Sequence, residues 1–270
     1  MSARGPVLLS SRDNPLLVSL RRLLRDGGAY RRQGLLWLEG DHLCRAALSR
    51  GVPVMQALVS ESGWRSAELQ SLAAAAPKVA IVTDVLWKEL SELGSPAPIG
   101  FVLEAPPARP LDPHASTVVL DRLQDAGNTG SILRSAAAFG VTQVLALKGT
   151  VALWSPKVLR AGMGAHFALS LLEGLEADAL GALQVPLLAT SSHAGALLHQ
   201  APLPSVAAWV FGHEGQGIAA ELASRCAMTL SIAQPGGEES LNVAAAAAVC
   251  LHQQAITATP GAAQVPQKVR

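Results

Sequence analysis

The sequence predicts an α/β protein of two domains, the second of them built on a parallel sheet. Short apolar runs alternate with helical segments along most of the 270 residues, which is the pattern of strand–helix–strand units. Residues 104–116 contain four prolines in thirteen positions, so they cannot continue a helix or a central strand. We therefore expect a first domain over residues 1–103, a linker over 104–116 and a second domain over 117–258. The Pro/Gly/Gln-rich tail, 259–270, is predicted to be disordered.

The first domain is expected to be small and to begin with an arginine-bearing helix. Asn14 can cap this helix and Pro15 suits its first position, and the periodic apolar residues of 16–24 follow. Further strands are expected at 35–38, 56–60, 79–82 and 100–103, and further helices at 42–49, 66–75 and 84–91. This alternation predicts a small α/β domain.

The second domain repeats the alternation with short apolar strands, which are typical of the buried strands of a parallel sheet. Its strands are expected at 117–120, 143–147, 168–171, 187–190, 207–211 and 228–232. Its helices are expected at 130–139, 156–163, 177–183, 218–224 and 241–257. No internal repeat is evident.

Positive charge is concentrated near the start of the chain. The whole protein carries a net charge of +1, but its first fifty residues hold nine arginines and four acidic residues. Such a basic segment suits a polyanionic partner such as RNA, although a solvated helical face would give the same count. Lys157 and Arg160 leave the same two interpretations open, as phosphate contacts or as a solvated face.

The cysteines and the termini predict a cytoplasmic protein. Cys44, Cys226 and Cys250 are odd in number and widely spaced, which favours reduced thiols over a disulfide framework or a zinc site. No apolar run is long enough to cross a bilayer, and the first residues lack the apolar segment of a signal peptide. We therefore expect neither a metal nor a membrane partner.

Three glycine-rich and polar blocks stand out in the second domain. The first, 120–140, passes from a strand through a loop with Gly127 and Asn128 into a helix that carries Arg134 about one turn from its start. Polar side chains at the carboxyl end of a strand, facing a helix N-terminus, suit an anionic ligand. A tight turn followed by a surface arginine gives the same pattern, and this block alone favours that plainer interpretation.

The second block, 209–218, also joins a strand to a helix. Gly212, Gly215 and Gly217 allow the backbone to approach a ligand closely. Glu214 could orient a substrate or merely cap the following helix. The block resembles a dinucleotide-binding loop only superficially, because no acidic residue closes a second strand about 20 residues on. A nicotinamide-dependent dehydrogenase is therefore disfavoured.

The third block, 230–244, leads into the alanine-rich last helix. Ser240 is the expected N-cap of that helix, and Asn242 would extend its amide from the first turn. Because all three blocks follow strands of one parallel sheet, their loops are expected to gather at its carboxyl edge. That edge is where open α/β folds bind ligands.

In order and spacing the blocks resemble the motifs of the SpoU (TrmH-like) family of the SPOUT superfamily, at 120–140, 211–218 and 232–244. Segment 155–167 is similar to the family's stretch between the first two motifs, and 10–60 resembles the substrate-binding domain that many members carry. The resemblance implies a C-terminal SPOUT-type domain with a trefoil-knotted parallel sheet. It also implies a small α/β, ribosomal-protein-like RNA-binding domain in front.

The resemblance implies an activity as well, namely methyl transfer from S-adenosylmethionine to a ribose 2′-hydroxyl of RNA by a homodimer. Ribosomal RNA is the first expectation and transfer RNA the alternative, and a non-catalytic RNA-binding or ribosome-assembly factor on the same fold stays open. By position, the cofactor pocket would be lined by Thr190, Gly212, Ile232 and Leu241. The functional polar positions would be Asn128, Arg134, Glu214, Ser240 and Asn242.

In that family the arginine matching Arg134 is implied to act on the ribose hydroxyl, and it can come from the partner subunit. Because a guanidinium stays protonated in proteins, we expect a charged contact to the ribose-phosphate ahead of proton abstraction. Ala126, His213, Ala244 and the pair 233–234 depart from the family's common residues. These departures concern substrate contacts and cofactor affinity and leave the reaction type unchanged.

Overall fold

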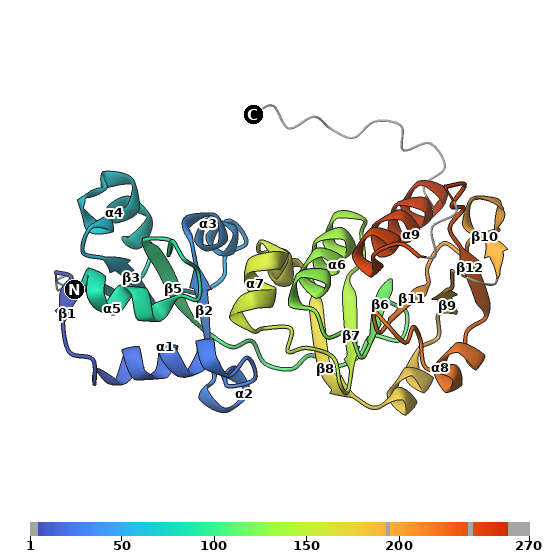
Figure 1. Cartoon of the computed structure of the whole chain (residues 1–270), viewed down its shortest axis with the longest axis horizontal. Coiled ribbons are helices and arrows are strands. Elements are labelled where there is room, and N and C mark those ends of the chain that lie inside the picture. The colour runs from blue at the N-terminus through green and yellow to red at the C-terminus, as the bar shows by residue number, and fades with distance from the viewer. Residues whose placement is uncertain (1–4, 193–194, 237–239, 259–270) are drawn as a thin grey trace. The chain divides into compact units, whose positions relative to one another are not determined.

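The computed structural model describes residues 5–192, 195–236 and 240–258, which form two compact units (Figure 1). Unit 1 comprises Met1–Ala108 with Ala152–Ala168, and unit 2 comprises Arg109–Val151 with Leu169–Arg270. The predicted tail, 259–270, lies outside the described residues. Within the described ranges, no helix has the length and apolar composition that a membrane span needs.

Unit 1 is built on a five-stranded mixed sheet. Its strands are β1 (Val7–Leu9), β2 (Leu35–Glu39), β3 (Gln56–Ser60), β4 (Val79–Val82) and β5 (Ile99–Glu104). They lie in the order β1-β4-β3-β5-β2, with β5 antiparallel to both of its neighbours and the other pairs parallel. Its helices include α1 (Pro15–Arg25), α2 (Tyr30–Gln33), α3 (Asp41–Ser49), α4 (Ala67–Ala73) and α5 (Asp84–Trp87), with short 3-10 turns η1 (Gly63–Arg65) and η2 (Lys88–Leu90). As expected, Asn14 caps α1, because its side-chain oxygen accepts from the Leu16 amide at 3.0 Å.

A segment between the first and second motif blocks packs into unit 1. This segment contains α7 (Pro156–Gly162) and η3 (Ala165–Ala168). An Arg160 Nη1–Glu39 Oε2 ion pair of 3.1 Å joins α7 to β2. After α7 the chain runs so close to α3 that a Cβ on Gly164 would lie 2.5 Å from the Cβ of Ala46. The second strand–helix series is therefore divided between the two units, because residues 152–168 belong to unit 1. Hydrophobic periodicity does not encode this division.

Unit 2 contains a seven-stranded sheet whose pairings are all parallel. Its strands are β6 (Thr117–Asp121), β7 (Gln143–Leu147), β8 (Ser170–Leu175), β9 (Leu187–Thr190), β10 (Ala196–Leu197), β11 (Ala208–Gly212) and β12 (Met228–Ser231). Their order is β10-β12-β9-β11-β6-β7-β8. The central strands β6, β7 and β11 are buried along their whole length, as the apolar runs predict.

Helices cover both faces of this sheet. They are α6 (Ala126–Ala138), α8 (Ala220–Ser224) and α9 (Val243–Ala258), with 3-10 turns η4 (Ala177–Ala182) and η5 (Leu198–Gln200). In Figure 1, α6 and α9 lie side by side on one face, and α8 lies on the other. On the α8 side, Leu180 and Leu222 pack against Val119, Leu145 and Val210 of the central strands. The central strands are therefore covered by helices on both faces.

Several elements differ from the sequence-based expectation. The segment 177–183 forms a 3-10 turn, and the strand expected at 168–171 occupies Ser170–Leu175 instead. The apolar run there begins before the strand does, so hydrophobicity alone could not locate its start. The short elements β1, α2 and β10 were not predicted, because two to four residues carry too little periodicity.

Candidate functional site

A cleft of about 770 Å³ opens where loops following β6, β9, β11 and β12 meet. These strands are neighbours in the order β12-β9-β11-β6 and run parallel, so their carboxyl ends share one edge of the sheet. The residues predicted from the sequence that line it are Asn128, Thr190, Gly212, Glu214, Ile232, Ser240, Leu241 and Asn242. The three blocks therefore do converge, and every predicted site residue except Arg134 lines this cleft.

The first block begins its helix earlier than expected. Asp125 caps α6, with its carboxylate accepting from the Asn128 amide at 2.6 Å, so the helix starts at Ala126 and not near Gly130. Asn128 is therefore a first-turn helical residue and not part of a free loop. The prediction that Arg134 lies about one turn into the helix is wrong, because it lies more than two turns in.

Three side chains, one from each block, form a hydrogen-bonded chain at the cleft, which we call the Glu214–Asn128–Asn242 chain. The Asn128 amide donates to Glu214 Oε1 at 3.3 Å, and the Asn242 amide donates to Asn128 Oδ1 at 2.9 Å. Asn128 is thus held from both sides, which sets the orientation of its amide group. Residues 86 and 114 positions apart in the sequence are brought into one network.

Glu214 is held as an acceptor by groups of the first block. Its two carboxylate oxygens accept from the backbone amides of Gln124 at 3.3 Å and Asp125 at 3.1 Å. Partial burial raises the pKa of Glu214, but hydrogen bonds from its own amide, Asp125, Asn128 and Gln124 together leave that pKa below its usual value. The carboxylate is therefore ionised at neutral pH. It does not cap α8, which was the plainer sequence interpretation.

Asn242 and not Ser240 caps the last helix. The Asn242 side-chain oxygen accepts from the amides of Ala244 at 2.9 Å and Ala245 at 3.3 Å, and α9 begins at Val243. The expectation of an N-cap at Ser240 is therefore wrong. Both residues have the chemistry of a cap, and only the direction of the backbone decides between them. Ser240 remains exposed on the cleft wall.

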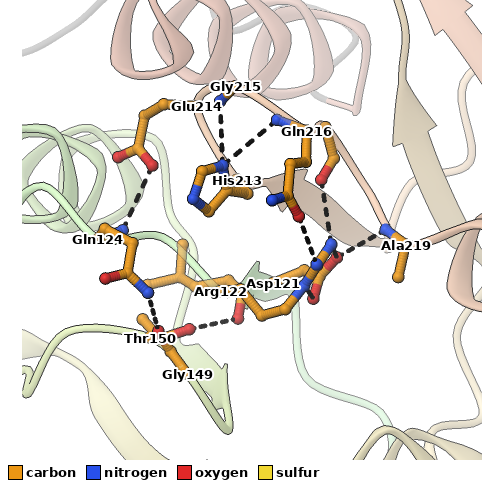
Figure 2. Close-up of polar contacts among 12 residues, drawn as sticks. Asp121, Arg122, Gln124, Gly149, Thr150, His213, Glu214, Gly215, Gln216 and Ala219 are labelled. Carbon is orange, nitrogen blue, oxygen red and sulfur yellow. Dashed lines mark hydrogen bonds and ion pairs between the residues drawn. The ribbon is translucent and has the colours of Figure 1, made fainter.

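The loop after β11 is a tight hairpin over Gly212–Gly217. His213 and Gly217 pair through two backbone hydrogen bonds of 3.0 and 2.8 Å. A Cβ on Gly212 would lie 2.2 Å from the carbonyl carbon of Gly217, so only glycine permits this fold-back. Figure 2 shows His213 Nδ1 accepting from the amides of Gly215 at 3.0 Å and Gln216 at 3.3 Å. His213 therefore stabilises the hairpin through its Nδ1 acceptor.

Arg134 is not brought into the cleft of its own chain. It is exposed on α6 and is absent from the cleft lining. No hydrogen bond or ion pair joins it to any other part of the chain that the structure describes. Arg134 follows Asn128 by six positions in α6, which turns its side chain about 120° around the helix axis relative to that of Asn128. Arg134 therefore does not contribute to the lining of this cleft in its own chain.

Sequence reasoning missed the residues that support the hairpin, namely Asp121, Arg122 and Gln216. Asp121 is buried at the end of β6, and its carboxylate pairs with the Arg122 guanidinium. The available signal was an acidic residue ending a buried apolar strand, because a buried carboxylate requires a partner. Lys157 and Arg160, for which phosphate contacts or a solvated face were both open, form ion pairs within unit 1, with Glu92 and Glu39 respectively.

Two features of the cleft test its fit to a nucleoside-type cofactor. The Oε1 atom of Gln234, a cleft residue, is buried without a hydrogen-bond partner among the described residues. A buried acceptor left unpaired costs about 1–3 kcal/mol, so a donor on a bound ligand would relieve it. The glycine hairpin adds closely packed backbone to the cleft wall. In the described part of the chain, no cluster of three His, Cys, Asp or Glu side chains suits a metal.

Similar sequences include RNA methyltransferases. An uncharacterized tRNA/rRNA methyltransferase of Synechocystis is 34% identical over 268 residues, which cover 94% of this chain and 96% of that protein. The 23S rRNA (guanosine(2553)-2′-O)-methyltransferase of Bacillus subtilis is 28% identical over 218 residues, covering 80% of this chain and 86% of that protein. The likeness extends over both units.

Solved structures have the same fold. An RNA 2′-O ribose methyltransferase matches with a TM-score of 0.78 and 32% identity, over 93% of this chain and 99% of that one. The SpoU methyltransferase AviRb of Streptomyces viridochromogenes, in complex with AdoMet, matches in fold with a TM-score of 0.79 at 24% identity, over 90% of this chain and 97% of that one. The expected α/β fold with a parallel sheet is confirmed. Since residues 115–252 also match the SpoU rRNA Methylase family, the chain belongs to that family.

Proposed function

We propose that this protein transfers a methyl group from S-adenosylmethionine to a ribose 2′-hydroxyl of RNA, with ribosomal RNA as the substrate. The observation that carries the proposal is the Glu214–Asn128–Asn242 chain, which joins three sequence blocks at one cleft. Membership of the SpoU rRNA methylase family supplies the reaction class. The Bacillus subtilis relative acts on 23S rRNA, which favours ribosomal over transfer RNA.

S-adenosylmethionine brings an already activated methyl group, so the protein's work is to position the acceptor oxygen and to manage its proton. Thr190, Gly212, Ile232 and Leu241 would hold the cofactor, since all four line the cleft. Gln234 adds a buried oxygen that has no partner among the described residues and could accept from a ligand N–H. A cleft of about 770 Å³ is within the range of about 300–1,000 Å³ that small-molecule sites occupy.

The Glu214–Asn128–Asn242 chain would orient the ribose. Asn128 and Asn242 each use one of their two side-chain amide hydrogens within the Glu214–Asn128–Asn242 chain. Among the described residues, each therefore keeps one side-chain N–H for a ligand oxygen. Glu214, ionised and held by the backbone amides of Gln124 and Asp125, fixes the direction of Asn128. Exposed Ser240 adds a hydroxyl on the cleft wall.

Arg134 would complete the site from a second subunit. Residues 243–251 of the last helix, α9, are all apolar, and Val249 and Ile256 remain 42% and 56% exposed although α9 packs beside α6. A helix that is apolar all round belongs in a buried setting, so a homodimer formed on the α6–α9 face accounts for this exposure. It would bring the partner's Arg134 to the cleft as a fixed positive charge for the ribose-phosphate.

The dimer proposal can be tested by mixing two inactive variants. Arg134→Ala and Asn128→Ala are co-expressed with different tags, and the mixed dimer is isolated. If Arg134 acts across the interface, one of the two sites in each mixed dimer is intact, and about half of the wild-type activity per dimer returns. A mixed dimer as inactive as its parents would place Arg134 in its own subunit's site and refute the cross-subunit arrangement.

Unit 1 would bind the RNA. Of the arginines near the start of the chain, Arg12, Arg21, Arg32 and Arg45 are occupied in ion pairs. Arg22, Arg25 and Arg50 form no ion pair within the described residues, so these three are the proposed phosphate contacts. A cytoplasmic site of action fits an RNA substrate and three free cysteines. The trefoil knot remains a prediction from the family resemblance.

The direct test is transfer of a tritiated methyl group to RNA purified from cells that lack this protein, followed by mapping of the modified ribose. We expect one 2′-O-methyl site in ribosomal RNA, lost in Asn128→Ala and retained in the matched surface variant Glu221→Gln. A product on transfer RNA would change the substrate, and a product on a base would refute the reaction. RNA binding without transfer would favour the non-catalytic assembly factor. Calorimetry tests the cofactor site separately, by titrating the protein with S-adenosylmethionine and with NAD. Binding of neither compound would favour the non-catalytic scaffold.

A further inference from the structure

Arg122 adopts a backbone conformation that arginine rarely takes. Its φ is +59°, and among the described non-glycine residues only Met163 shares a positive φ. An L side chain in this left-handed region is strained, and glycine is the residue that occupies it freely. Such strain persists where surrounding contacts hold it, and it often marks a functional constraint.

The conformation lets Arg122 reach its own sequence neighbour. Successive residues of a strand point to opposite faces of the sheet, so Asp121 and Arg122 would ordinarily diverge. Here the turn at Arg122 brings its guanidinium to the buried Asp121 carboxylate, with Nε–Oδ1 at 2.9 Å and Nη2–Oδ2 at 3.1 Å. This two-point pair has fixed geometry. The hydrogen bonds that Arg122 donates to the Asp121 carboxylate raise the pKa of Arg122, and a guanidinium stays protonated in proteins.

The same guanidinium also binds the glycine hairpin of the second block, 94 and 95 residues away (Figure 2). Its Nη1 donates to Gln216 Oε1 at 3.1 Å, and its Nη2 donates to the Gly217 carbonyl at 3.4 Å. Asp121 contributes from the other side, since its Oδ2 accepts from the Ala219 amide at 2.8 Å. We call this set of contacts the Arg122 bridge.

The Arg122 bridge lies behind the cleft wall and not in the cleft itself. Gln216 and Gly217 line the cleft, whereas Asp121 and Arg122 do not. On its remaining side, the Arg122 stem packs on Gly149, where a Cβ would approach Arg122 Cγ to 3.2 Å. The side chain is thereby confined between two loops, and its position sets that of the hairpin.

We propose that Arg122 is a positioning residue, which holds the Gly212–Gly217 hairpin against the end of β6 and thereby sets the affinity of the cleft for its adenosyl cofactor. The inference rests on the proposed function in that it takes this cleft as the cofactor site. Arg122 itself does not touch the cofactor. Because the bridge acts by preorganising the wall, its loss should weaken binding of the cofactor.

The test compares Arg122→Gly, which suits the left-handed backbone and removes the bridge, with Met163→Gly, which relieves the same kind of backbone strain in unit 1. Three quantities are measured for each: the dissociation constant of S-adenosylhomocysteine by calorimetry, amide hydrogen exchange of the hairpin, and the melting temperature. We expect Arg122→Gly to weaken binding about tenfold and to speed exchange in residues 213–219. The melting temperature should fall as well, because the buried Asp121 carboxylate loses its ion pair. Met163→Gly should change neither binding nor hairpin exchange.

A further variant separates charge from geometry. Arg122→Lys keeps the charge but cannot make the two-point pair, so its affinity should fall toward that of Arg122→Gly. Unchanged affinity and unchanged hairpin exchange in Arg122→Gly would overturn the proposal, as would a fall in melting temperature with normal binding. If the wild-type protein binds no S-adenosylhomocysteine, the cofactor assignment fails instead. Hairpin exchange in Arg122→Gly then still decides whether the bridge positions this loop.

Discussion

Asn242 has two tasks that a pair of substitutions can separate. Its side-chain oxygen caps α9, and its amide donates to Asn128 at 2.9 Å. Asn242→Ala removes both contacts. Losing an N-cap costs about 1 kcal/mol and losing a hydrogen bond about 1 kcal/mol, so the free energy of unfolding should fall by about 2 kcal/mol.

Asn242→Ser keeps an oxygen that can cap the helix and loses only the amide. The free energy of unfolding should then fall by about 1 kcal/mol, half the loss of the alanine variant. Methyl transfer should fall at least about tenfold in both variants, because Asn128 loses the donor that orients it from one side. Stability and activity are thus expected to respond differently to the two substitutions.

The assays are urea unfolding followed by circular dichroism and single-turnover methyl transfer at saturating cofactor and RNA. The slope of free energy against urea should stay the same in all variants, so that midpoints compare directly. Glu221→Gln, an exposed change on α8, is the control for both measurements. Wild-type turnover in Asn242→Ser would refute the orienting role of the amide, and unchanged stability in Asn242→Ala would refute the capping role.

Three further predictions concern pH and the buried acceptor. The folded pKa of Glu214 lies below its usual value of 4.5, so the stabilisation that the ionised carboxylate gives is present above pH 4.5 and is lost as pH falls through the folded pKa. The difference in unfolding midpoint between wild type and Glu214→Gln should therefore disappear on acidification, and a constant difference would contradict this. Burial lowers the pKa of His166 to about 4 from 6.5, so stability should fall as pH drops through that window, because only the unfolded state takes up the proton; unfolding midpoints of His166→Phe should depend less on pH there, and an equal slope would remove the histidine as the cause. Gln234→Met removes the buried oxygen that has no partner among the described residues, so the ligand-free protein should be at least as stable as wild type. The same variant should bind S-adenosylhomocysteine less tightly, and equal affinity in calorimetry would show that no donor of the ligand meets this oxygen.

The sheet of unit 2 was largely predictable because its strands are buried along their length. The apolar runs at β7 and β9 located those strands to the residue, and the glycine-rich blocks after β6, β11 and β12 met at one edge as expected. Strand burial and turn chemistry are local properties of the chain. The packing of α7 in unit 1 was not predictable, since an amphipathic helix does not encode which core it joins.

Helix starts in the blocks were decided by contacts over long sequence distances. Ser240 and Asn242 are both good caps by composition, but Asn242 also reaches Asn128. The sequence predicted a start of α6 near Gly130, whereas the Asp125 carboxylate caps a helix that starts at Ala126, beside Glu214. Capping propensity identifies several residues that could start a helix. Contacts with the neighbouring block determine which of them caps the helix in the folded protein.

By itself, the sequence determined the fold class, the edge of the sheet that bears the cleft, and the chemistry available there. Only the tertiary structure decided that Arg134 lies outside its own cleft and that Asn128 is held between Glu214 and Asn242. It also decided that Arg122 supports a hairpin more than ninety residues away. The physical reason is that periodicity and turn chemistry act between near neighbours, whereas side-chain direction and buried charge pairing depend on which distant strand ends the sheet brings together.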